Sequence, residues 1–175
     1  MFMFTSTTFY QRPLSYASYR TYSFTVLFVI GNLLLPQLTH LIPQGGLIFL
    51  PIYFFTLIAG YKFGVTVGLL TAVLSPIVNN LLFGMPPAFV LPAILIKSCL
   101  LAVAAAMVAG KSKKISLLHI LFVVLAYQII GSAAEWIMTN SFQNAMQDFT
   151  IGIPGMLIQI FGGCFLLQKM KGYGN

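Results

Sequence analysis

Long apolar runs, separated by short clusters of charged and turn-forming residues, make up most of this chain. Cutting the sequence at those clusters leaves six candidate membrane spans, at 22–41, 47–60, 63–83, 88–110, 115–139 and 149–167. A helix needs about 20 mainly apolar residues to cross a bilayer, and every run except the second is close to that length. The second run follows Pro43, Gly45 and Gly46, so it is predicted to begin irregularly and to be tilted or partly embedded.

The distribution of the basic residues between the two sides supports this division, because cutting the chain into spans does not decide on which side the charges fall. Eight of the nine lie in segments that a six-span bundle would expose on one side: Arg12, Arg20, Lys62, Lys111, Lys113, Lys114, Lys169 and Lys171. Lys and Arg concentrate in cytoplasmic loops. The pattern therefore predicts that both termini are cytoplasmic, with an N-terminal segment at 1–21, a six-helix membrane domain at 22–169 and a tail at 170–175.

The composition excludes a soluble domain. Hydrophobic residues make up 59% of the 175 residues and charged residues only 6%, against about a quarter in soluble domains. We therefore predict an all-α membrane protein, a six-transmembrane-helix bundle that passes several times through the cell membrane. The dispersed basic residues do not predict nucleic-acid binding. Cys99 and Cys164 lie in apolar runs, so neither a disulfide framework nor a metal site is indicated, and no cofactor is predicted.

The opposite, outer side is predicted to be rich in neutral hydrogen-bonding groups. Its segments contain Gln37, His40, Gln44, Asn79, Asn80, Asn140, Gln143, Asn144, Gln147 and Asp148. A solute is expected to arrive from this side.

Lys97 is the one basic residue inside a span. It stands nine positions into 88–110, so at about 1.5 Å per residue it is predicted about 14 Å below the outer end of its helix. A charge at that depth costs at least about 2.5–3.5 kcal/mol and needs a partner. Glu135 is the only acid inside a span. Either the two side chains form a structural pair, or one or both line an outward-facing cavity in which Lys97 binds a ligand carboxylate or phosphate.

His40 ends the first span and precedes a loop, 42–46, that is rich in Pro and Gly. This loop is interpreted either as a lid over the bundle or as a simple turn beside a solvated histidine. Trp136 follows Glu135 and is interpreted as an interfacial anchor or as a surface on which a flat ligand stacks.

Asn79 and Asn80 stand near the end of the third span, before the breaker sequence Gly-Met-Pro-Pro at 84–87. This arrangement predicts a tight turn into the fourth span. The two amides either satisfy carbonyl groups at the helix end or offer hydrogen bonds to a polar ligand.

Motifs of the common enzyme classes are missing from the sequence, which contains no HExxH, GxSxG or GxxxxGK[ST]. Two acidic residues in the whole chain leave little for general acid–base chemistry. The chain is therefore predicted not to be an enzyme, and the ATP hydrolysis of any active transport would come from partner subunits.

Three motifs between His40 and Gly110 resemble one family. A PxGG segment precedes the second span, LxxGxxxGxxxGLLTAxLSPxxN runs from Leu57 to Asn79, and GMPPxxxLP opens the fourth span. Together they are similar to the substrate-binding S components of energy-coupling factor (ECF) transporters, over about 70 residues of the chain.

The resemblance implies a substrate-capture subunit of an ECF-type importer in the cytoplasmic membrane of a bacterium. Such a subunit binds a small vitamin or cofactor precursor under the first inter-helix loop, and it assembles with a transmembrane coupling protein and two ATPase subunits. With Lys97 as a cationic anchor, the ligand is expected to be anionic. The other residues expected to complete or cover the site are Glu135, Trp136, Asn79, Asn80 and His40.

One feature of that family is missing. An AxxxA-like pattern on the first helix commonly docks the coupling protein, and residues 22–27 lack it. Coupling would then use other small residues, such as those at 102–106, or a divergent partner.

Two other function classes stay open. An autonomous small transporter or channel would need polar residues along a through-path, and the spans at 47–60, 63–83 and 149–167 contain few. A structural membrane subunit without a ligand would use Lys97 and Glu135 only as a packing pair. Co-purification with an ATPase module distinguishes the capture subunit from both.

Overall fold

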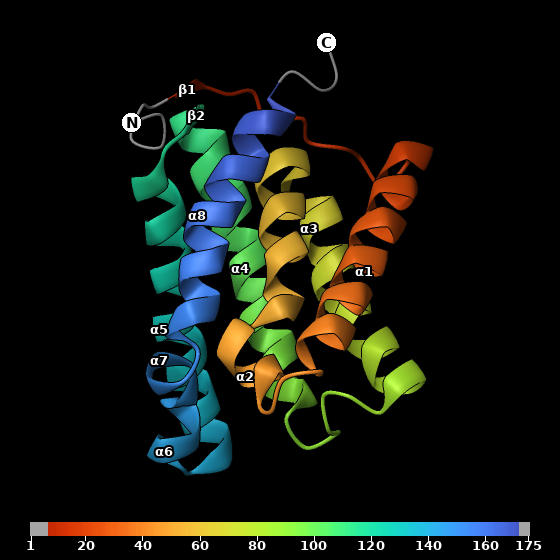
Figure 1. Ribbon diagram of the computed structural model, residues 1–175. Coiled ribbons are helices and arrows are strands. Elements are labelled where there is room, and N and C mark those ends of the chain that lie inside the picture. The colour runs from red at the N-terminus through yellow and green to blue at the C-terminus, as the bar shows by residue number, and fades with distance from the viewer. Residues whose placement is uncertain (1–6, 172–175) are drawn as a thin grey trace.

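The computed structural model describes residues 7–171, which form a bundle of long helices (Figure 1). Five helical stretches of this part are long and apolar enough to cross a membrane: α1 (Tyr19–Thr39), the stretch Gly45–Phe83, α4 (Leu91–Ser112), α5 (Leu117–Thr139) and α8 (Ile153–Met170). The prediction of a helical, multi-span membrane protein is confirmed at this level.

The longest of these stretches folds back on itself at Gly64. Helix α3 (Phe54–Phe83) contains a glycine with φ 84° and ψ −173°, a conformation that is essentially restricted to glycine. A Cβ added to Gly68 would lie 2.8 Å from Gly60 Cα, whereas residues eight apart in a straight helix are about 12 Å apart. The two arms of α3 are therefore side by side, as Figure 1 shows. The predicted loop at Lys62 is in fact helical, and the reversal comes at Gly64 instead.

Other element boundaries differ from those predicted. The second predicted span begins with two short elements, α2 (Gly45–Phe49) and a 3₁₀ turn (Pro51–Tyr53), which lead into α3. Helix α4 begins at Leu91 and not at 88, because residues 87–90 form the turn that enters it. The sixth predicted span begins late, because α6 (Phe142–Ala145) and α7 (Gln147–Thr150) precede α8.

An N-terminal strap, defined as residues 7–14, crosses one end of the bundle. Its strand β1 (Thr7–Thr8) pairs antiparallel with β2 (Lys114–Ile115). Further along the strap, Gln11 Nε2 donates hydrogen bonds to Gly60 O at 3.2 Å and to Ala106 O at 3.0 Å. The sequence predicted only a cytoplasmic segment at 1–21 and none of these contacts. Residues 1–6 of that segment and 172–175 of the predicted tail lie outside the described residues.

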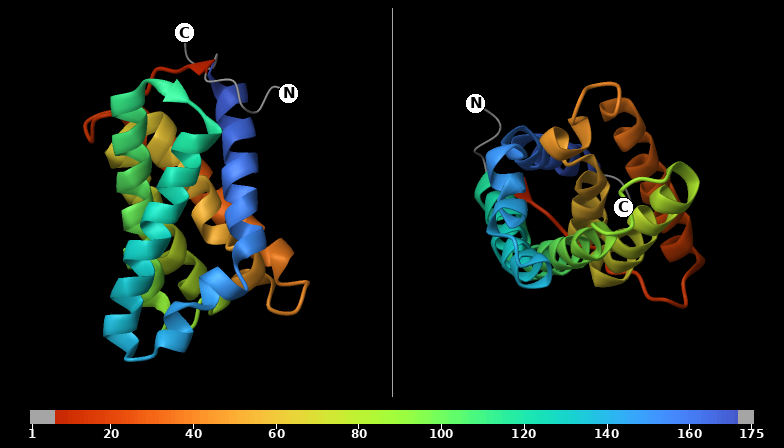
Figure 2. Two further views of the ribbon diagram at one scale, coloured as in Figure 1. Left: turned by 90° about the vertical axis from the view of Figure 1, so that its left-hand side faces the viewer. Right: turned by 90° about the horizontal axis from the view of Figure 1, so that it is seen from below.

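The basic residues lie at the same end of the molecule as the strap. Backbone N–H groups of Phe9 and Arg12 donate to Lys113 O and Lys62 O, each at 2.9 Å. The start of α1, the strand β2 and the C-terminal end of α8 lie at the same end (Figures 1 and 2). Eight of the nine basic residues are therefore at this strap end, and Lys97 is the exception.

Small residues let α3 and α4 pack closely. A Cβ on Gly60 would lie 2.7 Å from Ala102 O, and one on Gly68 would lie 3.2 Å from Ala102 Cβ. Ala102, Ala105 and Ala106 are buried. This stretch was expected to be an alternative docking surface for a coupling protein. That expectation is wrong for the three buried alanines, because packing inside the chain already covers them.

Asn32 joins α1 to both arms of α3. Its Nδ2 donates to Thr56 Oγ1 and Ser75 Oγ, each at 3.1 Å, and its Oδ1 accepts from Phe55 N at 3.1 Å. Phe55 is in the first turn of α3, where backbone N–H groups have no partner within the helix. One buried amide thus satisfies a helix end and connects three helical segments.

Candidate functional site

A cavity of about 410 Å³ opens at the end of the bundle opposite the strap. Its walls come from the end of α1, the segment 42–53, the turn 85–87, the first turns of α4, and the chain from Glu135 to Asp148. The lining residues are Pro36, His40, Ile42, Pro43, Gln44, Gly45, Gly46, Leu47, Leu50, Pro51, Ile52, Tyr53, Asn79, Met85, Pro86, Pro87, Val90, Ala93, Ile94, Lys97, Glu135, Asn144, Gln147 and Asp148. A volume of this size suits a small molecule.

Three charged side chains meet in this cavity. Lys97 Nζ lies 2.5 Å from Glu135 Oε2 and 2.8 Å from Asp148 Oδ2, so the lysine donates to both carboxylates. The Lys97 side chain is only 4% exposed, while those of Glu135 and Asp148 are 13% and 11% exposed. We call these three residues the charged triad. Both acidic residues of the chain belong to it.

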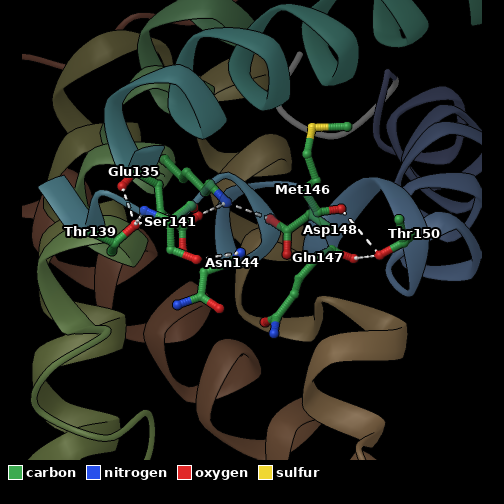
Figure 3. Close-up of polar contacts among 9 residues, drawn as sticks. Glu135, Thr139, Ser141, Asn144, Met146, Gln147, Asp148 and Thr150 are labelled. Carbon is green, nitrogen blue, oxygen red and sulfur yellow. Dashed lines mark hydrogen bonds and ion pairs between the residues drawn. The ribbon is translucent and has the colours of Figure 1, made fainter. Parts of the chain in front are cut away.

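A compact turn returns the chain so that Asp148 faces Glu135 (Figure 3). Thr139 Oγ1 donates to Glu135 O at 2.8 Å near the end of α5, and it accepts from Ser141 N at 3.3 Å. Ser141 Oγ then caps α6 by accepting from Asn144 N at 3.3 Å. These side chain to backbone bonds stabilise the turn after α5, and α7, which contacts α2, α6 and α8, carries Asp148 into the cavity.

Gly131 makes room for the lysine stem. It lies one helical turn before Glu135 on α5, and a Cβ at this position would lie only 2.5 Å from Lys97 Cγ. Any larger residue would push the lysine away from the face of α5 that carries its partner. Gly131 is thus a positioning residue for Lys97.

The segment 42–50, which we call the roof, closes one side of the cavity. Gln44 and Leu50 both have left-handed backbone conformations, with φ of 58° and 46°. Such conformations in residues other than glycine cost about 1–3 kcal/mol and often occur where a chain holds a ligand. A Cβ on Gly45 would overlap Thr39 O, so glycine is required where the roof leaves α1.

The predicted site residues are divided between the cavity and other places. Lys97, Glu135, Asn79 and His40 line the cavity. Lys97 is closer to the outer end of its helix than predicted. Because α4 begins at Leu91, the lysine lies about 9 Å from that end and not about 14 Å.

Asn80 and Trp136 are not part of the cavity wall. Asn80 Nδ2 donates to Pro86 O at 2.7 Å and so holds the turn before α4. Trp136 is 50% exposed, and its ring packs edge-to-face on Phe142 at 5.4 Å between centroids. It lines a second, apolar cavity together with Ser132 and Phe149. For Asn80 the structure thus favours the structural interpretation.

Sequence reasoning missed the role of Asp148. The residue was placed on the outer surface, because it stands between the fifth and sixth spans. A signal was present in the composition, since the chain has only two acidic residues and a buried lysine attracts any available carboxylate. The predicted anionic ligand also presupposed an unoccupied ammonium group, and Lys97 already binds two carboxylates.

Within residues 7–171 no group of three or more His, Cys, Asp or Glu side chains is arranged to hold a metal ion. Comparisons with protein-family models, curated proteins and solved structures found no match for this chain.

Proposed function

We propose that this chain is the substrate-capture subunit of an ECF-type importer, and that it binds a small vitamin-like molecule in the cavity. It crosses the membrane six times, with the two arms of α3 as separate crossings and both termini in the cytoplasm. A transmembrane coupling protein and two ATPase subunits are its partners. The observation that carries the proposal is the cavity with a charged triad at the end of the bundle opposite the basic residues.

The position of the cavity supports capture from the outside. Lys and Arg favour the cytoplasmic side, and eight of nine are at the strap end. The cavity is at the other end, which by this rule faces outwards. The PxGG motif at 43–46, one of those that resemble the S components, forms part of the roof.

The shape of the site favours capture over a through-channel. Every residue that lines the cavity belongs to the outer part of the bundle, as far as Lys97 on α4 and Tyr53 before α3. At the opposite end, the strap covers the Gly64 turn and its backbone is hydrogen-bonded to Lys62 and Phe63. A site open at one end and covered at the other suits a subunit that hands its ligand to a partner.

The buried ionic groups also favour a binding role. Charged residues at membrane depth are costly and commonly mark a substrate site. A packing pair would need one acid for one lysine, whereas here a second acid, Asp148, is brought in from a separate helix. The excess carboxylate is unnecessary for neutralising Lys97 and is available to a ligand.

Topology is tested by cysteine labelling in cells. Cys99 and Cys164 are replaced by alanine, and single cysteines are introduced as Gln143→Cys and Lys111→Cys, both at exposed positions. A membrane-impermeant maleimide should label Gln143→Cys on intact cells and Lys111→Cys only in inverted vesicles. The reverse pattern, or labelling of both from one side, would refute the proposed topology.

Capture and partnership are tested on affinity-tagged protein from its native membrane. An ATPase module and a coupling protein should co-purify, and native mass spectrometry should show one retained small molecule per chain. Ala93→Leu, which fills part of the cavity, should lose the ligand, and the control Ala133→Leu at an exposed position of α5 should keep it. Ligand retention without any ATPase partner would instead support an autonomous transporter. The absence of both a ligand and an ATPase partner would support a structural subunit.

A further inference from the structure

The charged triad has an excess of negative charge. Lys97 contributes +1 and Glu135 and Asp148 contribute −1 each, which leaves −1 in total. Apart from His40, the remaining lining residues are uncharged side chains. The cavity therefore has net negative charge in a setting where water screens poorly.

All three residues of the triad line the cavity, and the two carboxylates are more exposed there than the lysine. Lys97 is the least exposed of the three, and two of its three N–H donors are used. Each carboxylate contacts the lysine through one oxygen, Oε2 or Oδ2, and ionised carboxylates accept about four hydrogen bonds each. The triad therefore has one free hydrogen-bond donor but several free acceptors.

Two further polar groups of the cavity wall can still form hydrogen bonds. Tyr53 is 3% exposed and Asn79 is 2% exposed, and both line the cavity. Among the described residues, no hydrogen bond involves the Tyr53 hydroxyl, and that of Asn79 is a long contact of 3.5 Å from Gln37 Nε2 to Oδ1. Because both residues line the cavity, these two groups are free to form hydrogen bonds with a polar molecule there. The Tyr53 ring also offers an aromatic surface to a cation.

From these observations we propose that the ligand is a small organic cation with an amine-type nitrogen and an apolar body. The nitrogen binds the free oxygens of Glu135 and Asp148, beside Tyr53. The body lies against the apolar wall formed by Val90, Ile94 and the roof. An anion would have to approach Lys97 past two carboxylates. This inference rests on the proposed function, because it specifies the substrate class of the same cavity.

The charge of the retained molecule provides the first test. Wild-type protein in nanodiscs is analysed by native mass spectrometry, and the released molecule is identified by its charge in solution. Three probes of similar shape then compete for the site: 2-phenylethylammonium, 3-phenylpropionate and neutral 2-phenylethanol. We expect a cationic retained molecule that 2-phenylethylammonium displaces best.

Two substitutions with opposite expected effects provide the second test. Glu135→Gln keeps the shape of the side chain and one acceptor for Lys97, and it should weaken binding of 2-phenylethylammonium at least about tenfold. Lys97→Gln removes the competing cation, so binding of the same probe should be strengthened. Lys111→Gln, the same change on the same helix at the strap end, should leave binding unchanged. Thermal melting shows which variants are folded.

The outcomes separate this inference from the proposed function. A retained cation whose binding is weakened by Glu135→Gln and strengthened by Lys97→Gln supports both. A retained anion or neutral molecule, or preferential binding of 3-phenylpropionate that Lys97→Gln abolishes, overturns the cationic ligand and leaves capture standing. A wild-type protein that holds no molecule and binds none of the probes overturns both.

Discussion

Asp148 Oδ2 lies 2.8 Å from Lys97 Nζ, although the two residues are 51 positions apart in the sequence. Glu135 reaches the same nitrogen from α5. The buried lysine thus has two anionic partners from two separate helices, and both belong to the wall of one cavity. This redundancy has consequences for stability as well as for binding.

Neutralising the two acids should be strongly non-additive. Glu135→Gln or Asp148→Asn alone leaves Lys97 with one carboxylate, so each single variant should be only moderately destabilised. The double variant leaves an unpaired buried cation, which costs about 3–5 kcal/mol. We expect its loss of unfolding free energy to exceed the sum of the single losses by about 0.5–3 kcal/mol. Denaturant titration of detergent-solubilised protein measures this, and simple additivity would show that the triad is not coupled.

Replacing Gly64, at the turn inside α3, should destabilise the protein more than replacing Gly84, at the turn that follows α3. Gly64 has φ 84° and ψ −173°, and its added Cβ would lie 3.2 Å from Pro13 Cα. Gly64→Ala should therefore destabilise the protein by about 1–3 kcal/mol. Gly84 has φ 67° and ψ 14° with open space around it, and Gly84→Asn should cost much less, because asparagine tolerates this region. Equal melting temperatures for the two variants would contradict the hairpin geometry.

Asn32 should be a stability residue with no role in binding. Asn32→Leu removes two donated hydrogen bonds and one accepted from Phe55 N, and it leaves buried polar groups without partners. A loss of about 1–3 kcal/mol is expected. Gln143→Leu, at an exposed position, is the matched control and should change stability little. Thermal melting checks the difference; a folded Asn32→Leu protein should still retain its ligand.

Gly131→Ala should weaken ligand binding, although Gly131 does not line the cavity. The new Cβ would lie 2.5 Å from Lys97 Cγ, so the lysine must move and the carboxylates must follow it. We expect weaker retention of the bound molecule in native mass spectrometry. Gly110→Ala is the control, because its Cβ would meet only Gln11 Oε1, at 3.2 Å, at the strap end. Undiminished retention in Gly131→Ala would show that displacing the Lys97 stem does not move the two carboxylates that bind the ligand.

The sequence alone determined that this is a multi-span helical membrane protein, because the hydrocarbon core requires long apolar helices and hydropathy records that requirement residue by residue. It also placed Lys97, Glu135, Asn79 and His40 in one region, because alternating spans bring every second loop to the same side. Both conclusions follow from the order of apolar and charged residues along the chain, without knowledge of how the helices pack.

Only the tertiary structure decided that Asp148 turns inward while Trp136 faces away from the cavity and Asn80 holds a turn. Hydropathy does not distinguish an acid on a loop from one carried back by two short helices, since the turn into α6 and α7 is set by the hydrogen bond from Ser141 N to Thr139 Oγ1 and by the Ser141 cap on α6. The same holds for Gly131, whose importance comes from a side chain on another helix. Contacts between distant segments, which the apolar pattern does not encode, decided the chemistry of the site.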